Sequence, residues 1–179
     1  QARQMRAQLG VVPQMDNLDP DFTVTENLYT YASYFGLCRS QVKERIEYLL
    51  DFLELSEKAA SKIRELSGGM KRRLGIAQTL ISDPKVMVVD EPTVGQHPLD
   101  IERFMPVLRD LPGPVVYVEH DSQAAKAADR VIDLGPGAGD QGGRVVFQGG
   151  WGELKKETRS LTAKYLRGDL RISVPARRR

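Results

Sequence analysis

The stretch from Leu66 to Glu91 limits the fold of this chain more than any other, because it couples a glycine-opened helix to a buried strand. Its sequence is LSGGMKRRLGIAQTLISDPKVMVVDE. Ser67 is a favourable helix N-cap, and Gly68 and Gly69 leave the amides of the first turn uncovered. The positive end of a helix over Met70–Ile81 can therefore meet an anion such as phosphate.

A short apolar run, Val86–Val89, follows this helix and ends in two adjacent carboxylates, Asp90 and Glu91. Asp83-Pro84 stops the helix, and an apolar run of this length is typical of a strand buried in a parallel sheet. Open α/β sheets bind ligands at the carboxyl ends of their strands. A capped helix or such a strand alone is also ordinary α/β core, but their order and spacing together favour a ligand site.

The same stretch resembles two segments of ABC ATPases, with Leu66–Met70 at the place of the signature and the strand before Asp90 at the place of Walker B. The resemblance implies an α/β, P-loop NTPase-like ABC ATPase domain, present in part, that acts on ATP with Mg²⁺. In that family Asp90 would order the magnesium and Glu91 would be the general base. Two such domains sandwich ATP, so the phosphate of the partner's ATP would lie against Ser67, Gly68 and Gly69.

Three further residues take roles from this resemblance. A short strand over Leu9–Val12 leads to Gln14, at the place of the Q-loop glutamine that reaches magnesium and the attacking water. A second apolar strand precedes His120, at the place of the switch histidine that contacts the γ-phosphate, and Asp100 takes the D-loop position. Without the resemblance, we would interpret Gln14 as a surface loop glutamine, and a lone histidine such as His120 is more often structural.

The two halves of the chain resemble different branches of the family. Residues 1–93, with MDNLDPDFTVTENLYTYASYFGL, resemble exporter ATPases of the nodulation and drug-resistance type. Residues 94–179, with DRVIDLGPGAGDQGGRVVFQG, resemble the bacterial excinuclease A subunit, which recognises DNA damage. The resemblances imply export as the coupled process, with DNA repair as the alternative.

Local patterns predict several helices and loops. Thr25 is a plausible N-cap, and the apolar spacing over 41–55 predicts an amphipathic helix with one core face. We interpret the basic trio Lys71–Arg73 as a solvated run, because charge runs usually are solvated. Gly137–Gly142 matches G-x-G-x-x-G, but a strand rather than a helix should follow it, so we expect a hairpin loop instead of a dinucleotide site.

We expect four parts along the chain. Residues 1–24 form the Q-loop region of the core, 25–66 a small helical subdomain, and 67–154 the part with signature, Walker B, D-loop and switch histidine. Residues 155–179 form a basic tail with nine Lys or Arg against Glu157 and Asp169, a net charge of +7, while the whole chain carries +2.

Composition is that of an ordinary globular protein, with 41% hydrophobic and 28% charged residues among 179. A single cysteine, Cys38, excludes a disulfide framework and a four-cysteine zinc site. With neither a signal peptide nor a long apolar run, we expect a cytoplasmic protein, or one peripheral on the inner face of the membrane.

No G-x-x-x-x-G-K-[ST] segment occurs in these 179 residues, which begin with Gln1. We therefore expect a fragment that is inactive alone, because the P-loop supplies the main phosphate ligands, and whose intact parent hydrolyses ATP. The expected partners are a second ABC domain and a membrane-spanning transporter subunit, or DNA in the repair alternative. A third hypothesis is a non-catalytic regulatory fragment that bears only the signature.

Overall fold

The computed structural model describes residues 8–15, 17–135, 137 and 142–171. The chain divides into two compact units, Gln1–His120 and Asp121–Arg179. Among the described helices, none combines the length and apolar character needed to cross a membrane.

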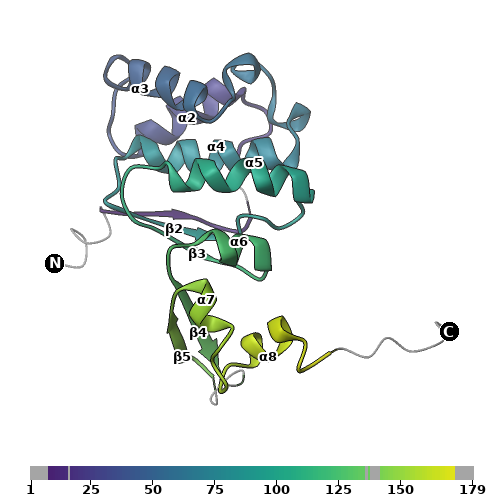
Figure 1. Ribbon diagram of the computed structural model, residues 1–179. Helices are drawn as coiled ribbons and strands as arrows, with labels where there is room; N and C mark the ends of the chain where they lie inside the picture. Colours follow the sequence, from purple (N-terminus) through teal and green to yellow (C-terminus); the bar gives the residue numbers. More distant parts are fainter. Residues whose placement is uncertain (1–7, 16, 136, 138–141, 172–179) are drawn as a thin grey trace. The chain divides into compact units, whose positions relative to one another are not determined.

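A three-stranded parallel sheet forms the base of the first unit (Figure 1). The order is β1 (Leu9–Val12), β2 (Val86–Asp90) and β3 (Val115–Val118), with β2 in the middle. Leu9 pairs with Val86 at one end of the sheet, and Asp90 pairs with Val118 at the other. This register brings the carboxyl ends of all three strands to one edge, and the expected parallel sheet is confirmed.

Helix α4 (Gly68–Ile81) lies between the sheet and the helices α2 (Val24–Tyr34) and α3 (Arg39–Phe52), and α5 (Pro98–Arg109) lies beside it on the same side of the sheet (Figure 1). Of the eight successive positions 74–81 of α4, all except Gly75 are buried, as expected for a helix enclosed on several sides. They are Leu74, Ile76, Ala77, Gln78, Thr79, Leu80 and Ile81.

The expected cap of α4 is confirmed: the Ser67 hydroxyl accepts a hydrogen bond from the Met70 amide at 3.2 Å. The expected cap of α2 was wrong. Thr23, not Thr25, precedes that helix, and it forms a reciprocal capping box in which Glu26 accepts from the Thr23 amide at 2.7 Å. Thr25 lies inside the helix, where its hydroxyl donates to the Ala59 carbonyl.

Two 3₁₀ turns, η1 (Ser56–Lys58) and η2 (Ile63–Glu65), connect α3 to α4. The expected amphipathic helix over 41–55 is α3, and its apolar positions Val42, Ile46, Leu49 and Leu50 are buried. With α2 and the turns it forms a helical layer over α4.

The sheet of the first unit has one covered and one exposed face. Val12, Met87 and Val89 are buried on the side of α4, whereas residues that alternate with them on β1 and β3 are about half exposed. These exposed residues are Leu9, Val11, Val116 and Val118. Parallel sheets normally have both faces covered, and among the described residues of this unit no helix covers the second face.

The second unit contains α6 (Ser122–Ala127), β4 (Val131–Gly135), β5 (Arg144–Gly149), α7 (Trp151–Leu154) and α8 (Leu161–Arg167). Strands β4 and β5 are antiparallel neighbours, so the expected strand after the G-x-G-x-x-G match is confirmed. Residues 138–141 of the expected hairpin loop lie outside the described residues.

The segment expected as a basic tail begins with folded structure. The hydroxyls of Ser160 and Thr162 donate to the Asp133 carboxylate at 2.5 and 3.0 Å, which anchors α8 to β4. Arg167 donates to the carbonyls of Lys155 and Glu157, both at 2.8 Å. At least part of the positive charge there serves local structure.

Candidate functional site

Three of the sequence-predicted residues meet at the carboxyl edge of the sheet. The Gln14 amide nitrogen donates to Glu91 Oε2 at 2.5 Å, and His120 Nε2 lies 3.3 Å from Glu91 Oε1. Gln14 follows β1, Glu91 follows β2 and His120 follows β3, so the parallel register places all three at one edge. The His120 side chain is 83% exposed and that of Glu91 only 21%, which leaves the histidine open to a ligand.

The backbone at Glu91 is unusual. Its φ of 46° lies in the left-handed region, which costs a residue with a Cβ about 1–2 kcal/mol. Its amide still donates to the Val118 carbonyl at 2.9 Å, so the residue remains tied to β3 while its carboxylate turns toward Gln14 and His120. Strain of this kind often occurs at functional sites.

The N-terminus of α4 is open, as predicted from Gly68 and Gly69. A Cβ added to Gly68 would meet no atom within 4 Å, and one added to Gly69 would meet only Gln96 and Ser67 at 3.7 Å or more. Ser67 and Gly68 are exposed. The first-turn amides can therefore donate hydrogen bonds to an anion that comes from outside the unit.

The expected solvation of the basic trio was wrong for two of its members. Arg73 forms an ion pair with Glu54 at 2.5 Å and its side chain is only 15% exposed. The Arg72 guanidinium donates to the carbonyls of Pro13 and Asp90, and it lies 3.4 Å from the Gln14 carbonyl. These arginines point from the start of α4 into the molecule, which a run of basic letters does not reveal.

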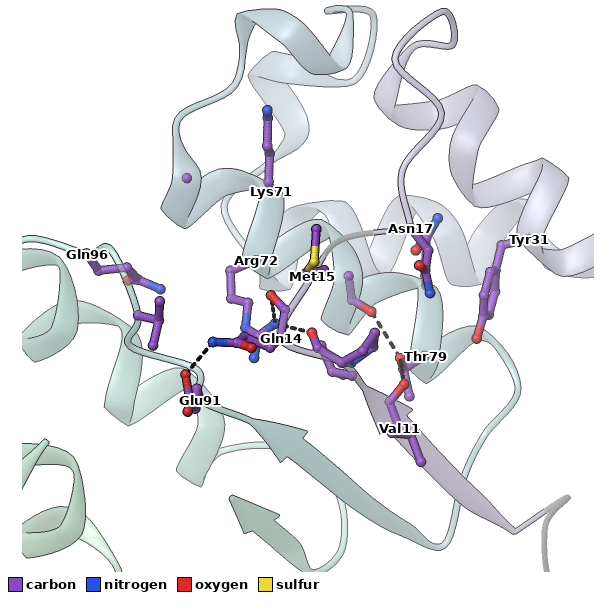
Figure 2. A pocket seen from close by; sticks show the side chains of 16 residues that line it. Val11, Gln14, Met15, Asn17, Tyr31, Lys71, Arg72, Thr79, Glu91 and Gln96 are labelled. Carbon is purple, nitrogen blue, oxygen red and sulfur yellow. Dashed lines mark hydrogen bonds between the residues drawn. The ribbon is translucent and has the colours of Figure 1, made fainter. Parts of the chain in front are cut away.

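Burial lowers the pKa of the Arg72 guanidinium, and the nearby carboxylates of Asp90, Glu119 and Glu91 oppose that shift. An arginine remains charged under such conditions. The site thus has a fixed positive charge near three carboxylates, and Figure 2 shows Arg72 beside one of them, Glu91.

Glu119 is a site residue that the sequence reasoning missed. Its Oε1 accepts the Thr93 amide at 2.7 Å and its Oε2 accepts the His120 amide at 3.0 Å. The carboxylate therefore links the turn after Glu91 to the histidine. Its position directly before His120 at a strand end was a usable signal.

A cavity of about 130 Å³ lies beside this group, lined by Gln14, Arg72, Glu91, Gly68 and Gln96 among others (Figure 2). Small-molecule pockets usually measure about 300–1,000 Å³, so the cavity alone does not enclose a nucleotide. It has room for a few waters, at about 30 Å³ each.

The oxygen atoms at this edge of the sheet fit a magnesium ion that is bound partly by the protein and partly by phosphate groups. Within the described ranges no group of three or more His, Cys, Asp or Glu could hold a metal. Mg²⁺, however, usually takes one or two protein oxygens and completes its shell with phosphates and water. Asp90 at the end of β2 and Gln14 offer such oxygens, while Asp100 lies exposed in the first turn of α5.

Comparison with known proteins identifies the class that this fold and site define, an ATP-binding cassette domain. A family model described as ABC transporter matches residues 1–94. The chain therefore belongs to the ABC transporter family.

Curated relatives are named Nod factor export ATP-binding protein I. The protein of Cupriavidus metallidurans is 53% identical over 97 residues, covering 54% of this chain and 32% of the relative. The protein of Rhizobium etli is 41% identical over 153 residues, covering 83% of this chain and 46% of the relative. The chain thus spans about a third to a half of these relatives' length.

Solved structures agree on the fold. CbiO1 from Clostridium perfringens, part of the ABC transporter complex cbiONQ, matches with a TM-score of 0.73 at 24% identity, covering 92% of this chain and 66% of that one. The ATP-binding cassette MJ0796, a dimer in a post-hydrolysis state bound to ADP and Pi, matches with a TM-score of 0.62 at 29% identity, covering 73% and 60%. The expected α/β ABC ATPase fold is confirmed.

Proposed function

We propose that this chain is part of an ABC ATPase that hydrolyses ATP as a dimer and powers export through a membrane-spanning partner. The observation that carries the proposal is the convergence of Gln14, Glu91 and His120 at the carboxyl edge of a parallel sheet. A general base and a side chain that positions the attacking water recur in enzymes that transfer phosphoryl groups to water, and Glu91 and Gln14 can fill these roles while His120 contacts the phosphate.

Each residue has a distinct role in this proposal. Glu91 polarises the attacking water, Gln14 orients that water and offers an oxygen to magnesium, and His120 contacts the γ-phosphate. Asp90 would help to hold Mg²⁺. The ion, when bound, would neutralise negative charge on the phosphates. Positioning and electrostatic stabilisation account for most of the acceleration in such reactions.

The signature serves the partner domain. Ser67, Gly68 and Gly69 would present open first-turn amides to the phosphate of ATP bound in trans, and Asp100, exposed in the first turn of α5, would make the D-loop contact with that domain. The dimeric ATP-binding cassette with ADP and Pi supports a sandwich of two domains.

Export is favoured over DNA repair by the curated relatives. The Rhizobium etli alignment covers 83% of the chain, so it cannot lie within the first 94 residues and continues into the half that resembles the excinuclease subunit. An exporter relative thus accounts for more of the chain than the first half alone.

The experiment adds a P-loop to this chain. We would fuse the part of the Cupriavidus metallidurans relative that precedes its aligned region to residues 1–179 and measure magnesium-dependent phosphate release. The chimera should hydrolyse ATP, whereas the 179-residue chain should not exceed its own Glu91→Gln variant. In the chimera, Glu91→Gln should stop turnover yet retain bound ATP in a dimer.

Two results would contradict the proposal. Turnover by the chimera that Glu91→Gln leaves unchanged would show that Glu91 is not the base. Loss of ATP binding in that variant would assign Glu91 a structural role instead.

A further inference from the structure

Arg72 joins three elements that the proposed reaction uses. It stands on α4, in the turn that follows the open first-turn amides of Gly68 and Gly69. One guanidinium nitrogen donates to the carbonyl of Pro13, directly before Gln14, and the other terminal nitrogen donates to the carbonyl of Asp90, directly before Glu91. A single side chain thus holds the backbone at the ends of both β1 and β2. Figure 2 shows Arg72 beside Gln14 and Glu91.

We propose that Arg72 is a positioning residue that links the phosphate-binding end of α4 to Gln14 and Glu91, so that ATP held in trans by the signature sets the geometry of the hydrolysis site in cis. This inference rests on the proposed ATPase function and adds a specific residue to it. Arg72 does not contact the reacting atoms itself; it acts through the two backbone segments that it holds.

The geometry suits this role. A planar guanidinium with donors in a fixed fork can bridge two carbonyls at a defined distance, whereas the single ammonium nitrogen of lysine on its flexible stem fixes that distance less well. Residue 13 directly follows β1 and residue 90 is the last of β2, and the register of these two neighbouring strands is already fixed by the pairing of Val12 with Val89. Arg72 extends that fixed spacing past the strand ends to the segment where Gln14 and Glu91 meet at 2.5 Å.

Burial limits how far this link can move. Arg72 is only partly exposed, and its Nε is buried without a hydrogen-bond partner. Removing a hydrogen-bond partner from a partly buried charged group costs stability, because the group is then left without a partner and with little water around it. A shift of α4 therefore carries the bridged carbonyls with it, because breaking either hydrogen bond would leave the guanidinium less satisfied.

The first test measures backbone order in the 179-residue chain and needs no ATPase activity. Hydrogen exchange would be followed by mass spectrometry in Arg72→Gln, Arg72→Lys and an exposed control, Arg103→Ala on α5. We expect exchange at least about tenfold faster in peptides that cover 8–15 and 86–95 in Arg72→Gln, with the buried part of α4 unchanged. Arg72→Lys should recover part of the protection, and the control should match the parent.

The second test uses the ATP-competent chimera. Because a misplacement of about 1 Å can cost roughly 10²-fold in rate, Arg72→Gln should lower kcat by about tenfold or more. Its KM for ATP should stay within about threefold, since the nucleotide contacts themselves remain. Arg72→Lys should fall between the parent and Arg72→Gln, and Arg103→Ala should equal the parent.

The outcomes separate this inference from the proposed function. Unchanged exchange at 8–15 and 86–95, or faster exchange spread equally over α4, overturns the link, as does a kcat within about twofold of the parent. An inactive parent chimera would count against the proposed function alone, because the exchange experiment still decides the role of Arg72.

Discussion

Glu91 combines a proposed catalytic carboxylate with a left-handed backbone, at φ 46°. We expect Glu91→Gly to be more stable than Glu91→Ala by about 1 kcal/mol, since both lose the contacts of the carboxylate but only glycine adopts this φ without strain. Urea unfolding of both variants of the 179-residue chain measures the difference. Equal stability, or a more stable alanine variant, would show that this backbone conformation is not kept in solution.

Gly68 allows a separate test of the open helix end. Since a Cβ there meets no atom within 4 Å, Gly68→Asp should leave unfolding unchanged within about 0.5 kcal/mol. The added carboxylate should nevertheless repel phosphate and abolish the ATP-dependent dimer of the Glu91→Gln chimera, measured by light scattering. Gly68→Ala is the matched control and should dimerise better than Gly68→Asp. If the aspartate variant dimerises as well as its parent, the signature assignment is wrong.

For single residues, the sequence indicated which side chains stand at strand ends. It did not indicate the role of a side chain whose hydrogen-bond partners come from distant parts of the chain. Gln14, Glu91 and His120 each follow a short apolar run, and parallel register then brings them together. Arg72 was misread because its partners are backbone carbonyls 18 residues or more away along the chain. No local pattern marks a carbonyl as the partner of a distant side chain.

The contact between β1 and α4 decides how the elements pack. A Cβ at Gly10 would lie 2.5 Å from Thr79 Cγ2 and 2.9 Å from Pro84 Cγ, neither of which is the end of a flexible side chain. Gly10→Ala should therefore destabilise the chain by about 1–3 kcal/mol, the usual cost of overpacking. Gly152→Ala, where nothing lies within 4 Å, is the control. An unchanged urea midpoint for Gly10→Ala would mean that β1 does not lie this close to α4.

The boundaries of helices and strands could be predicted where neighbouring residues determine them, and not where a tertiary contact does. The ends of α4 were predicted well because Ser67 and Asp83-Pro84 are strong signals in the sequence. The start of α2 was misplaced although Thr23 and Glu26 form the T-x-x-E pattern of a capping box, so that signal was present and overlooked. The folded start of the basic segment depends on Asp133 of β4, which only the tertiary structure brings to Ser160.

At the scale of the whole molecule, DNA binding distinguishes the two hypotheses for the coupled process, export and DNA repair. At physiological salt, we expect the ATP-competent chimera to bind DNA weakly with no preference for damaged duplex. That binding should be almost wholly lost when Arg177, Arg178 and Arg179, which lie outside the described residues, are replaced by Ala. A net charge of +7 in residues 155–179 attracts any polyanion through phosphate contacts that carry no sequence or damage information.

Fluorescence anisotropy with intact and lesion-bearing duplexes over a salt series measures this binding. The comparison with the triple-alanine variant is the control for the charge of the tail. A preference for damage of about tenfold, or about 1.4 kcal/mol, that survives the loss of the three arginines would replace export by repair.

We expect the exposed sheet face to affect how long the chain survives in a cell. This face exposes the apolar side chains of Leu9, Val11, Val116 and Val118. Chaperones bind and proteases degrade chains with exposed apolar surface of this kind. The concentration of this polypeptide in vivo would then depend on whether that face is shielded, and not on the chemistry at the strand ends. Two variants with identical catalytic groups could differ several-fold in abundance through a single change on this face.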